Sequence, residues 1–392
     1  MSLRVLHVTP YFAPAFVYGG PPRSVLGLCL GLQRAGTQVA VVTTTANGDT
    51  ELPDDAAARS SVDGVPVVYL HRTFPRRHFR ASGLRTWLAA HRRDFDLVHI
   101  HGCWNFFGRS AARWCRTAGL PYVLSPRGML HPWSFAQGRV RKAIAYRLVE
   151  LKTLRAARFI HTTSDEESRV VSALGVAADI VMIPNGVDAA APVPAVSVEQ
   201  FRQRLGASPG DFMLLFLGRL HPKKGIDRLI AAFRQALKTV PNLYLVFAGS
   251  GDAEYLRHLR ETTRDLEQPR RIAFAGFLDG DDRRFALASA DAFVLTSHSE
   301  NFGMGVAEAM AAGLPVIVSR ECPWGQIEEW RAGCWVDNTP AAIAAAIETL
   351  ASDPAAARAM GENGRRGVAR SLDWKTLAAA MLGAYREALA PN

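Results

Sequence analysis

Two carboxylates flank a glycine-containing turn in the stretch SHSENFGMGVAEAMAAGLPVI, residues 297–317. Glu300 precedes the turn and Glu308 follows it, with Gly303 and Gly305 between them. Carboxylates accept hydrogen bonds from vicinal hydroxyls, and unpaired amides at a helix N-terminus bind phosphate. For either glutamate alone, a structural salt bridge at a helix start explains the residue equally well. The pair predicts a ligand that carries both sugar and phosphate, such as a nucleotide or a nucleotide sugar.

A second group of polar residues is the basic loop GRLHPKKG at residues 218–225, directly after an apolar run. The guanidinium of Arg219 can bind phosphate bidentately, and the ammonium of Lys224 can bind it as a point charge. By itself this is an ordinary basic loop. Together with the turn after Glu300, it predicts a diphosphate clamp with cations on one side and peptide amides on the other.

These groups need a scaffold, and the chain supplies short apolar runs that alternate with helix-length segments, which is typical of parallel α/β sheets. The turn Pro184-Asn185-Gly186 ends the first series of runs, and the alternation restarts near Phe212. We therefore expect one domain at residues 1–185 and a second at 186–373. A polar stretch at residues 47–63 is expected to be a surface loop. The predicted strands are Arg4–Thr9, Gln38–Thr44, Val65–Leu70, Asp96–His101, Tyr122–Ser125, Phe159–Thr162, Ile180–Ile183, Phe212–Leu217, Tyr244–Ala248, Arg271–Phe274, Ala292–Leu295, Pro315–Val318 and Gly333–Val336.

The turn and the helix after it resemble a known signature. Glu300, the Phe-Gly pair, Glu308 and the following Ala-Met-Ala-x-Gly-x-Pro-Val-Ile are similar to the motif of family four glycosyltransferases, which are retaining enzymes. Asn301 stands where many members have glycine. The resemblance implies the GT-B fold, an α/β fold in which two Rossmann-like doubly wound parallel-sheet domains face each other across a cleft. The N-terminal domain would bind the acceptor and the C-terminal domain the donor, with the helix at residues 374–390 crossing back to the first domain.

The resemblance also implies roles for single residues. Arg219 and Lys224 would neutralise the leaving nucleoside diphosphate, His101 would contact the donor sugar, and Glu300 would hold sugar hydroxyls, so these four are the predicted catalytic residues. Arg127 is predicted to meet the acceptor or a phosphate. The predicted donor-binding residues are Gly19, Gly20, Gly218, Gly249, Gly276, Phe277, Asn301, Phe302, Gly303, Met304, Gly305 and Glu308.

Metal sites are a rival interpretation of three short patterns. His99, His101 and Cys103 would share one face of a strand and could bind zinc. Asp94-Phe-Asp96 and Asp279-Gly-Asp281 match the Asp-x-Asp pattern of metal-dependent transferases. Because Arg219 and Lys224 already supply fixed cations, we expect no metal and no cofactor beyond the donor substrate.

The net charge of +10 comes from the first half of the chain, because residues 1–188 hold 23 Lys/Arg against 13 Asp/Glu. Much of this excess lies in two clusters, at Arg72–Arg93 and Arg139–Arg158. Such clusters attract anionic membranes, nucleic acid or phosphorylated substrates, although a solvated helix face is the ordinary explanation. The five cysteines and the lack of an export signal favour a cytoplasmic protein. The basic first half predicts peripheral contact with the inner face of the membrane.

The sequence thus predicts transfer of a sugar from a nucleotide sugar to a glycan or lipid-linked acceptor, in surface polysaccharide or glycolipid assembly. A nucleotide-sugar epimerase of the same fold is the first alternative. A basic nucleic-acid-binding protein is a weaker one, because the arginine clusters lack the interleaved aromatic residues that stack on bases. No nucleic-acid partner is expected.

Overall fold

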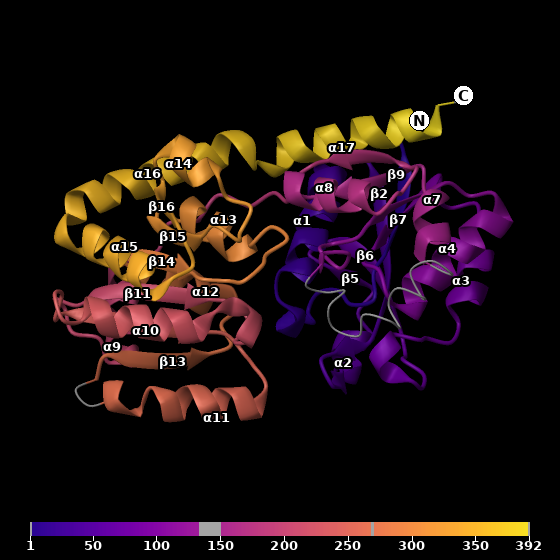
Figure 1. The fold of residues 1–392 in the computed structure, drawn as a ribbon. Coiled ribbons are helices and arrows are strands. Elements are labelled where there is room, and N and C mark those ends of the chain that lie inside the picture. Colours follow the sequence, from indigo (N-terminus) through magenta and orange to yellow (C-terminus); the bar gives the residue numbers. More distant parts are fainter. Residues whose placement is uncertain (1, 133–149, 268–269, 391–392) are drawn as a thin grey trace. The chain divides into compact units, whose positions relative to one another are not determined.

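A computed structural model describes residues 2–132, 150–267 and 270–390. The chain forms two compact units (Figure 1). Unit 1 comprises residues 1–186 together with 374–392, and unit 2 comprises residues 187–373. No helix among the described residues combines the length and the apolar composition that crossing a bilayer requires.

Unit 1 is built on a sheet with the strand order β10-β9-β8-β7-β1-β2-β6-β5 among the described residues. All neighbouring strands are parallel except β5, which pairs antiparallel with β6 at the edge. The central strands are buried on both faces, as expected where helices cover a parallel sheet. The strands are β1 (Arg4–Val8), β2 (Gln38–Thr44), β5 (Ser61–Val62), β6 (Val65–Leu70), β7 (Leu97–His101), β8 (Tyr122–Ser125), β9 (Phe159–Thr162) and β10 (Asp179–Met182).

The helices of unit 1 include its last element, α17, which lies against α1 (Figure 1). Trp374 at the start of α17 is 5% exposed, and its ring fills the space over Gly27 of α1 and over Gly186. A Cβ at either glycine would meet this ring at 2.4 Å, so both positions need glycine. The helices are α1 (Gly20–Arg34), α2 (Asp54–Ala57), α3 (Leu84–Ala90), α4 (Phe106–Ala118), α7 (Leu151–Arg155), α8 (Asp165–Ala173) and α17 (Trp374–Leu389), with 3-10 turns η1 (Phe16–Tyr18) and η2 (Arg76–His78).

Unit 2 contains a parallel sheet with the order β13-β12-β11-β14-β15-β16. Its strands are β11 (Phe212–Leu217), β12 (Leu243–Ala248), β13 (Ile272–Gly276), β14 (Ala292–Leu295), β15 (Val316–Ser319) and β16 (Gly333–Val336). Its helices are α9 (Ala195–Leu205), α10 (Ile226–Ala236), α11 (Ala253–Thr262), α12 (Gly280–Ser289), α13 (Met304–Ala311), α14 (Gln326–Trp330), α15 (Pro340–Ser352) and α16 (Pro354–Ser371), with 3-10 turns η4 (Pro222–Lys224) and η5 (Arg264–Leu266).

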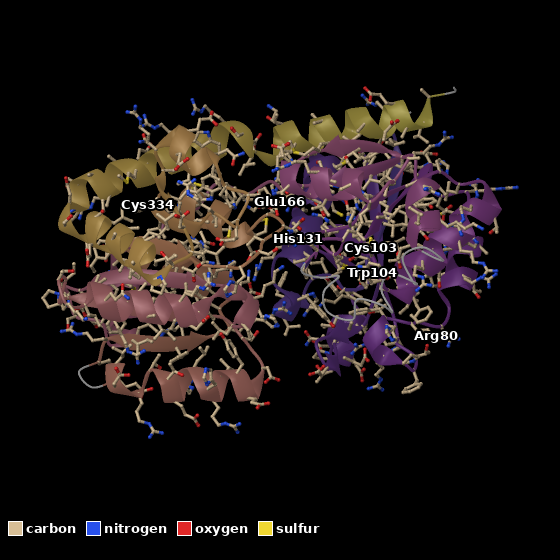
Figure 2. The ribbon with its side chains drawn as sticks, viewed as in Figure 1. Arg80, Cys103, Trp104, His131, Glu166 and Cys334 are labelled. Atoms are coloured by element: carbon tan, nitrogen blue, oxygen red, sulfur yellow. The ribbon has the colours of Figure 1, made fainter. Side chains whose placement is uncertain are left out.

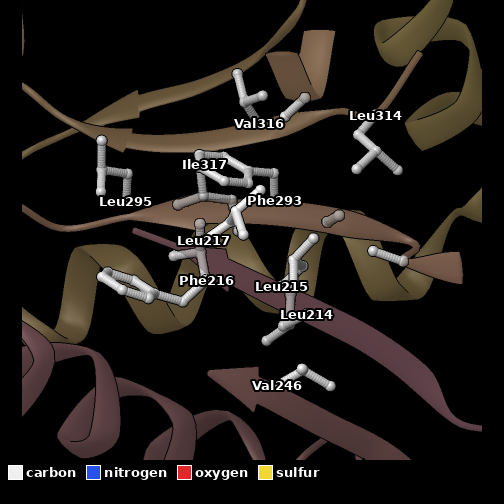
Figure 3. Close-up of a cluster of buried hydrophobic side chains, with 14 of the residues drawn as sticks. Leu214, Leu215, Phe216, Leu217, Val246, Phe293, Leu295, Leu314, Val316 and Ile317 are labelled. Atoms are coloured by element: carbon white, nitrogen blue, oxygen red, sulfur yellow. The ribbon is translucent and has the colours of Figure 1, made fainter. Parts of the chain in front are cut away.

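The core of unit 2 is formed by the side chains of its central strands (Figure 3). Phe216 of β11, Phe293 of β14 and Ile317 of β15 are fully buried. Helix α10 packs against α15, and α13 packs against α16. Because crossover connections are right-handed, the helices that follow β11 and β14 cover opposite faces of the sheet.

Each sheet has one point at which the strand order reverses. In unit 1 the chain proceeds from β1 to one edge and from β7 to the other, and in unit 2 the same reversal separates β11 from β14. Ligands of doubly wound sheets bind at the carboxyl ends of the strands beside such a point. The loops after β1, β7, β11 and β14 are therefore the positions where a site is expected, and they carry most of the predicted residues.

Residues 47–63 were predicted to form a surface loop, and this prediction is wrong because the segment contains regular elements. A short antiparallel pair, β3 (Ala46–Asn47) and β4 (Thr50–Glu51), is followed by α2 and by β5. Leu52 and Ala56 are buried in a small cluster with Ala15. The polar composition hid these contacts, because only two side chains of the segment need to be apolar for it to pack.

Candidate functional site

Lys224 and Glu300 form an ion pair in unit 2, although they are far apart in the sequence. Lys224 ends η4 in the loop after β11, and Glu300 lies in the loop after β14, so both stand beside the reversal of strand order. The two side chains are 18% and 13% exposed. Burial alone would raise the pKa of Glu300, but the charge of Lys224 and the Ser297 hydroxyl, which donates to Oε1 at 2.6 Å, hold that pKa below its ordinary value. Glu300 is therefore an ionised acceptor at neutral pH.

The two loops meet because backbone contacts fasten them together. The Thr296 hydroxyl donates to the Gly225 carbonyl at 3.0 Å, and the His298 amide donates to the Lys223 carbonyl at 2.8 Å. Gly225 has a φ of +61°, and a Cβ there would lie 2.1 Å from the Thr296 carbonyl oxygen. Glycine at 225 thus allows the close approach that places Lys224 beside Glu300.

Glu308, the second predicted carboxylate, pairs with Arg283 of α12. Both side chains are largely buried, at 15% and 18% exposed. Arg283 was not predicted as a site residue, although it lies two positions after the Asp279-Gly-Asp281 pattern, because that pattern was considered only for metal binding. The only signal available was that an ionised glutamate on the apolar helix α13 needs a partner.

Helix α13 begins at Met304, after Gly303 in a left-handed conformation with a φ of +81°. The buried Trp324 indole donates to the Phe302 carbonyl at 2.5 Å, and its ring lies 5.2 Å from that of Phe302. This contact fixes the backbone that leads from Glu300 into the helix. The first amides of α13, including those of Met304 and Gly305, therefore stand at a defined place beside the basic loop.

The remaining predicted donor residues of unit 2 also lie at strand ends. Gly218 follows β11, Gly249 follows β12, and Gly276 ends β13. A Cβ at position 249 would lie only 1.8 Å from the Gly218 carbonyl oxygen, so Gly249 allows the two loops to approach closely. Asn301 and Phe302 belong to the turn after Glu300, and Phe277 is 48% exposed.

Arg219 differs from Lys224 in its surroundings. Its side chain is exposed and has no hydrogen-bond or ion-pair partner among residues 2–132, 150–267 and 270–390. An unengaged guanidinium beside the Lys224–Glu300 pair is available to a ligand phosphate.

Gly19, Gly20, His101 and Arg127 belong to unit 1, and the structure places them at the carboxyl edge of its sheet. Gly20 is the first residue of α1, with Gly19 as its N-cap at a φ of +83°. His101 ends β7, and Arg127 follows β8 with a φ of +56°. These four residues therefore gather around the reversal of strand order in the first sheet.

The loop that carries Arg127 is held by contacts from two other elements (Figure 2). The Trp104 indole donates to the Met129 carbonyl at 2.8 Å, and His131 Nε2 lies 2.9 Å from Glu166 Oε1 of α8. The amide of Gly128 donates to Glu167 Oε1 at 2.5 Å. Contacts from Trp104, which lies just before α4, and from two glutamates of α8 thus set the position of Arg127.

Four buried histidines line the strands of unit 1, and two of them, His99 and His161, belong to one hydrogen-bonded chain. The Ile183 carbonyl can only accept, so His161 Nε2 donates to it at 2.9 Å and His161 Nδ1 accepts from the Ser125 hydroxyl at 2.5 Å. Ser125 Oγ then accepts from His99 Nε2 at 2.9 Å, and His99 Nδ1 accepts from the Tyr385 hydroxyl at 2.6 Å. The direction of every bond is therefore fixed by one carbonyl, and the histidines in this chain are neutral.

Burial explains why these rings stay neutral. It lowers the pKa of His7 and of His161 to about 3, with the charge of Arg127 acting in the same sense. The pKa values of His99 and His101 are also well below the ordinary value, again mainly because of burial. Tyr385, which comes from α17, is fully buried against them.

The zinc alternative does not fit this arrangement. His7, rather than Cys103, is the third group near His99 and His101. Both nitrogens of His99 and both of His101 already hold hydrogen bonds, and the cationic Arg127 contacts the cluster. A metal ion would have to displace several of these bonds next to a like charge.

The two Asp-x-Asp patterns are used within the fold. Asp96 pairs with Arg4 at 2.6 Å, and this contact lowers its pKa. Asp281 pairs with Arg284 at 2.5 Å, in the first turn of α12. Helix α12 begins at Gly280 with Asp279 as its N-cap, so this Asp-x-Asp pattern opens a helix.

Two family models match the chain. The model described as glycosyl transferases group 1 matches residues 197–367, and the model described as glycosyl transferase 4-like domain matches residues 19–186. The chain is 30% identical over 409 residues to the uncharacterized glycosyltransferase MJ1607 of Methanocaldococcus jannaschii, covering 99% of both chains. It is 28% identical to the D-inositol 3-phosphate glycosyltransferase of Kineococcus radiotolerans, covering 99% of this chain and 95% of that protein.

Solved structures agree on the fold. The Anabaena protein HepE, in complex with UDP and glucose, superimposes with a TM-score of 0.78 at 20% identity, covering 98% of this chain and all of that one. The sucrose-phosphate synthase of Thermosynechococcus elongatus gives a TM-score of 0.78 at 22% identity, covering 98% of each chain. The predicted fold class, a GT-B pair of parallel α/β sheet domains, is confirmed.

Proposed function

We propose, since the chain belongs to the glycosyl transferases group 1 family, that it transfers a sugar to an acceptor hydroxyl with retention of the anomeric configuration. It is a glycosyltransferase that depends on a nucleotide sugar. The observation that carries the proposal is the meeting of Lys224 and Glu300 beside the first turn of α13. Cationic, anionic and amide groups there match the phosphates and hydroxyls of such a donor.

Departure of the nucleoside diphosphate builds negative charge on its oxygens and positive charge on the sugar. Lys224, Arg219 and the first amides of α13 would stabilise the negative charge by preorganisation. Glu300 would hold sugar hydroxyls, Glu308 would hold the ribose, and His101 would contact the donor sugar. We favour attack on the same face as the leaving group, without a covalent intermediate.

The nucleotide is identified by a thermal-shift panel with UDP, GDP and ADP. The preferred diphosphate at 100 times its dissociation constant should stabilise the protein by about 2.7 kcal/mol. UMP, GMP and AMP are the matched controls, because they keep the base and lose the second phosphate. UDP is the first candidate, since HepE is seen with it.

Stabilisation should be the same in EDTA, because Lys224 and Arg219 supply cations at the diphosphate. No stabilisation by any of the three diphosphates would contradict the proposed site. Strict dependence of turnover on an added divalent ion would contradict the metal-independent mechanism.

We further propose a lipid-linked or glycan acceptor in surface polysaccharide or glycolipid assembly, with unit 1 in peripheral contact with an anionic membrane. Phe74 is 88% exposed and precedes Arg76, whose side chain is 64% exposed. An exposed aromatic ring close to an exposed arginine suits an anionic interface. Arg139, Arg141, Lys142 and Arg147 of the second basic cluster lie outside the described residues.

Membrane contact is tested by sedimentation with vesicles. At low salt the protein should bind vesicles that contain anionic lipid and not neutral ones, and Phe74→Ser should weaken binding about tenfold, because a buried Phe contributes about 1.5–3 kcal/mol. Phe277→Ser, at an exposed phenylalanine of unit 2, is the control and should bind normally. Equal binding to neutral and anionic vesicles would refute the contact.

A further inference from the structure

Arg127 carries a charge that no carboxylate neutralises within the part of the chain that the structure describes. Its Nη1 donates to Asn185 Oδ1 at 2.6 Å and lies 3.4 Å from Ser24 Oγ. Its Nη2 lies 3.2 Å from His101 Nδ1. The Nε atom is buried without a partner. Burial lowers the pKa of Arg127, and the charge of Glu167 only partly opposes this.

Glu167 cannot move to pair with Arg127 without losing its own contacts. Its Oε1 accepts from the Gly128 amide at 2.5 Å, and its Oε2 accepts from the Thr163 amide at 2.8 Å. A buried guanidinium without an ion pair is costly unless an anion joins it.

The neighbouring histidines present a second unpaired donor. Arginine can only donate, so His101 Nδ1 accepts from it, and His101 Nε2 must carry the ring proton. That proton is donated to His7 Nδ1 at 2.9 Å. His7 therefore carries its own proton on Nε2, the atom that is buried without a partner. A water molecule could accept this bond, but it would leave the charge of Arg127 uncompensated.

The place of these groups in the sheet suits a ligand. His7, His101 and Arg127 lie on or after β1, β7 and β8, at the carboxyl edge beside the reversal of strand order. Ser24 belongs to α1, whose N-terminus brings a positive dipole end to the same edge. Arg127 as a whole residue is partly exposed, while its Nε atom is buried.

We infer that Arg127, supported by His7, binds an anionic group of the acceptor, a carboxylate or a phosphate attached to a sugar. The identification of this ligand as the acceptor rests on the proposed function. The binding of an acidic sugar at Arg127 does not, and it can be measured without turnover.

The test uses the full chain with Arg219→Ala and Lys224→Ala, which remove the cations proposed to hold the donor diphosphate. Glucose 6-phosphate, glucuronate and glucose are titrated at low ionic strength by calorimetry. The two acidic sugars should bind at least tenfold more tightly than glucose, and the tighter of the two identifies phosphate or carboxylate as the preferred group. Equal binding of all three sugars would overturn the inference.

Arg127→Gln in the same background should remove the preference for acidic sugars, and Arg127→Lys should keep part of it, since it retains the charge. Arg113→Gln, at an exposed arginine of α4, is the matched control and should change nothing. In the chain with Arg219 and Lys224 intact, Arg127→Gln should leave nucleoside diphosphate affinity within about twofold. Unchanged acidic-sugar binding with a tenfold loss of diphosphate affinity would assign Arg127 to the donor and overturn the inference. Failure of nucleotides to bind at all would instead refute the proposed function.

Discussion

Replacing Lys224 with alanine is expected to lower kcat by about 10²- to 10³-fold while the protein stays folded. In the proposed mechanism the ammonium stabilises the charge that develops on the departing diphosphate, and one preorganised donor of this kind contributes about 2.7–4 kcal/mol in the transition state. Glu300 keeps the Ser297 hydroxyl as a partner in the variant, so the loop retains a contact. Release of nucleoside diphosphate from the nucleotide sugar measures the effect even when the acceptor is unknown.

Lys223→Ala is the matched control for this variant. Lys223 has the same side chain one position earlier, but Lys224 is the residue that pairs with Glu300. We expect Lys223→Ala to change kcat by less than about tenfold, equivalent to 1.4 kcal/mol. A native kcat for Lys224→Ala, or an equal loss in the two variants, would contradict the assignment of the clamp.

Unit 1 is expected to lose stability steeply as the pH falls below 6.5. His7, His99, His101 and His161 are neutral and buried, with pKa values lowered from 6.5, so the unfolded chain binds protons that the folded chain does not. Their contribution is constant above pH 6.5 and declines as the pH falls toward 3. Between pH 6.5 and 5.5 each ring lowers the free energy of unfolding by about 1 kcal/mol, so the four together lower it by about 4 kcal/mol.

Hydrogen exchange measured at several pH values separates the two units. Amides in β1, β7, β8 and β9 should lose protection with acid, whereas those of β11 and β14 serve as an internal reference. His161→Asn should remove about a quarter of the pH dependence, while His258→Gln, at an exposed histidine of α11, should leave it unchanged. A flat stability of unit 1 between pH 7 and 5 would show that the histidines are not held neutral.

Most strands could be predicted because each is a short apolar run, and many of these runs stand beside a glycine or proline. The runs at Phe212–Leu217 and Ala292–Leu295 match β11 and β14 at both ends. Helices α15 and α16 were not predicted, because α15 is almost uniformly small and apolar and shows little periodicity. The two-residue strands β3, β4 and β5 were also missed, since their pairing depends on neighbours and not on composition.

The candidate site was only partly predictable, because some of its contacts depend on how separate elements pack together. Arg219, Lys224 and Glu300 directly follow apolar runs, so their place at strand ends could be inferred from the sequence. Arg283 opposite Glu308 could not, because the contact joins two helices. His7 gave a weak signal, a polar residue inside an apolar strand, but its bond to His101 depends on the alignment of β1 with β7.

Helix α17 has a consequence for how the chain is made. The ribosome adds Trp374, which covers Gly27 and Gly186, and Tyr385, which donates to His99, only after residues 187–373. All of unit 2 has been synthesised by then, whereas unit 1 still lacks a side of its core. The domain begun first is therefore completed only after unit 2, and the histidine chain can close only once Tyr385 has been added.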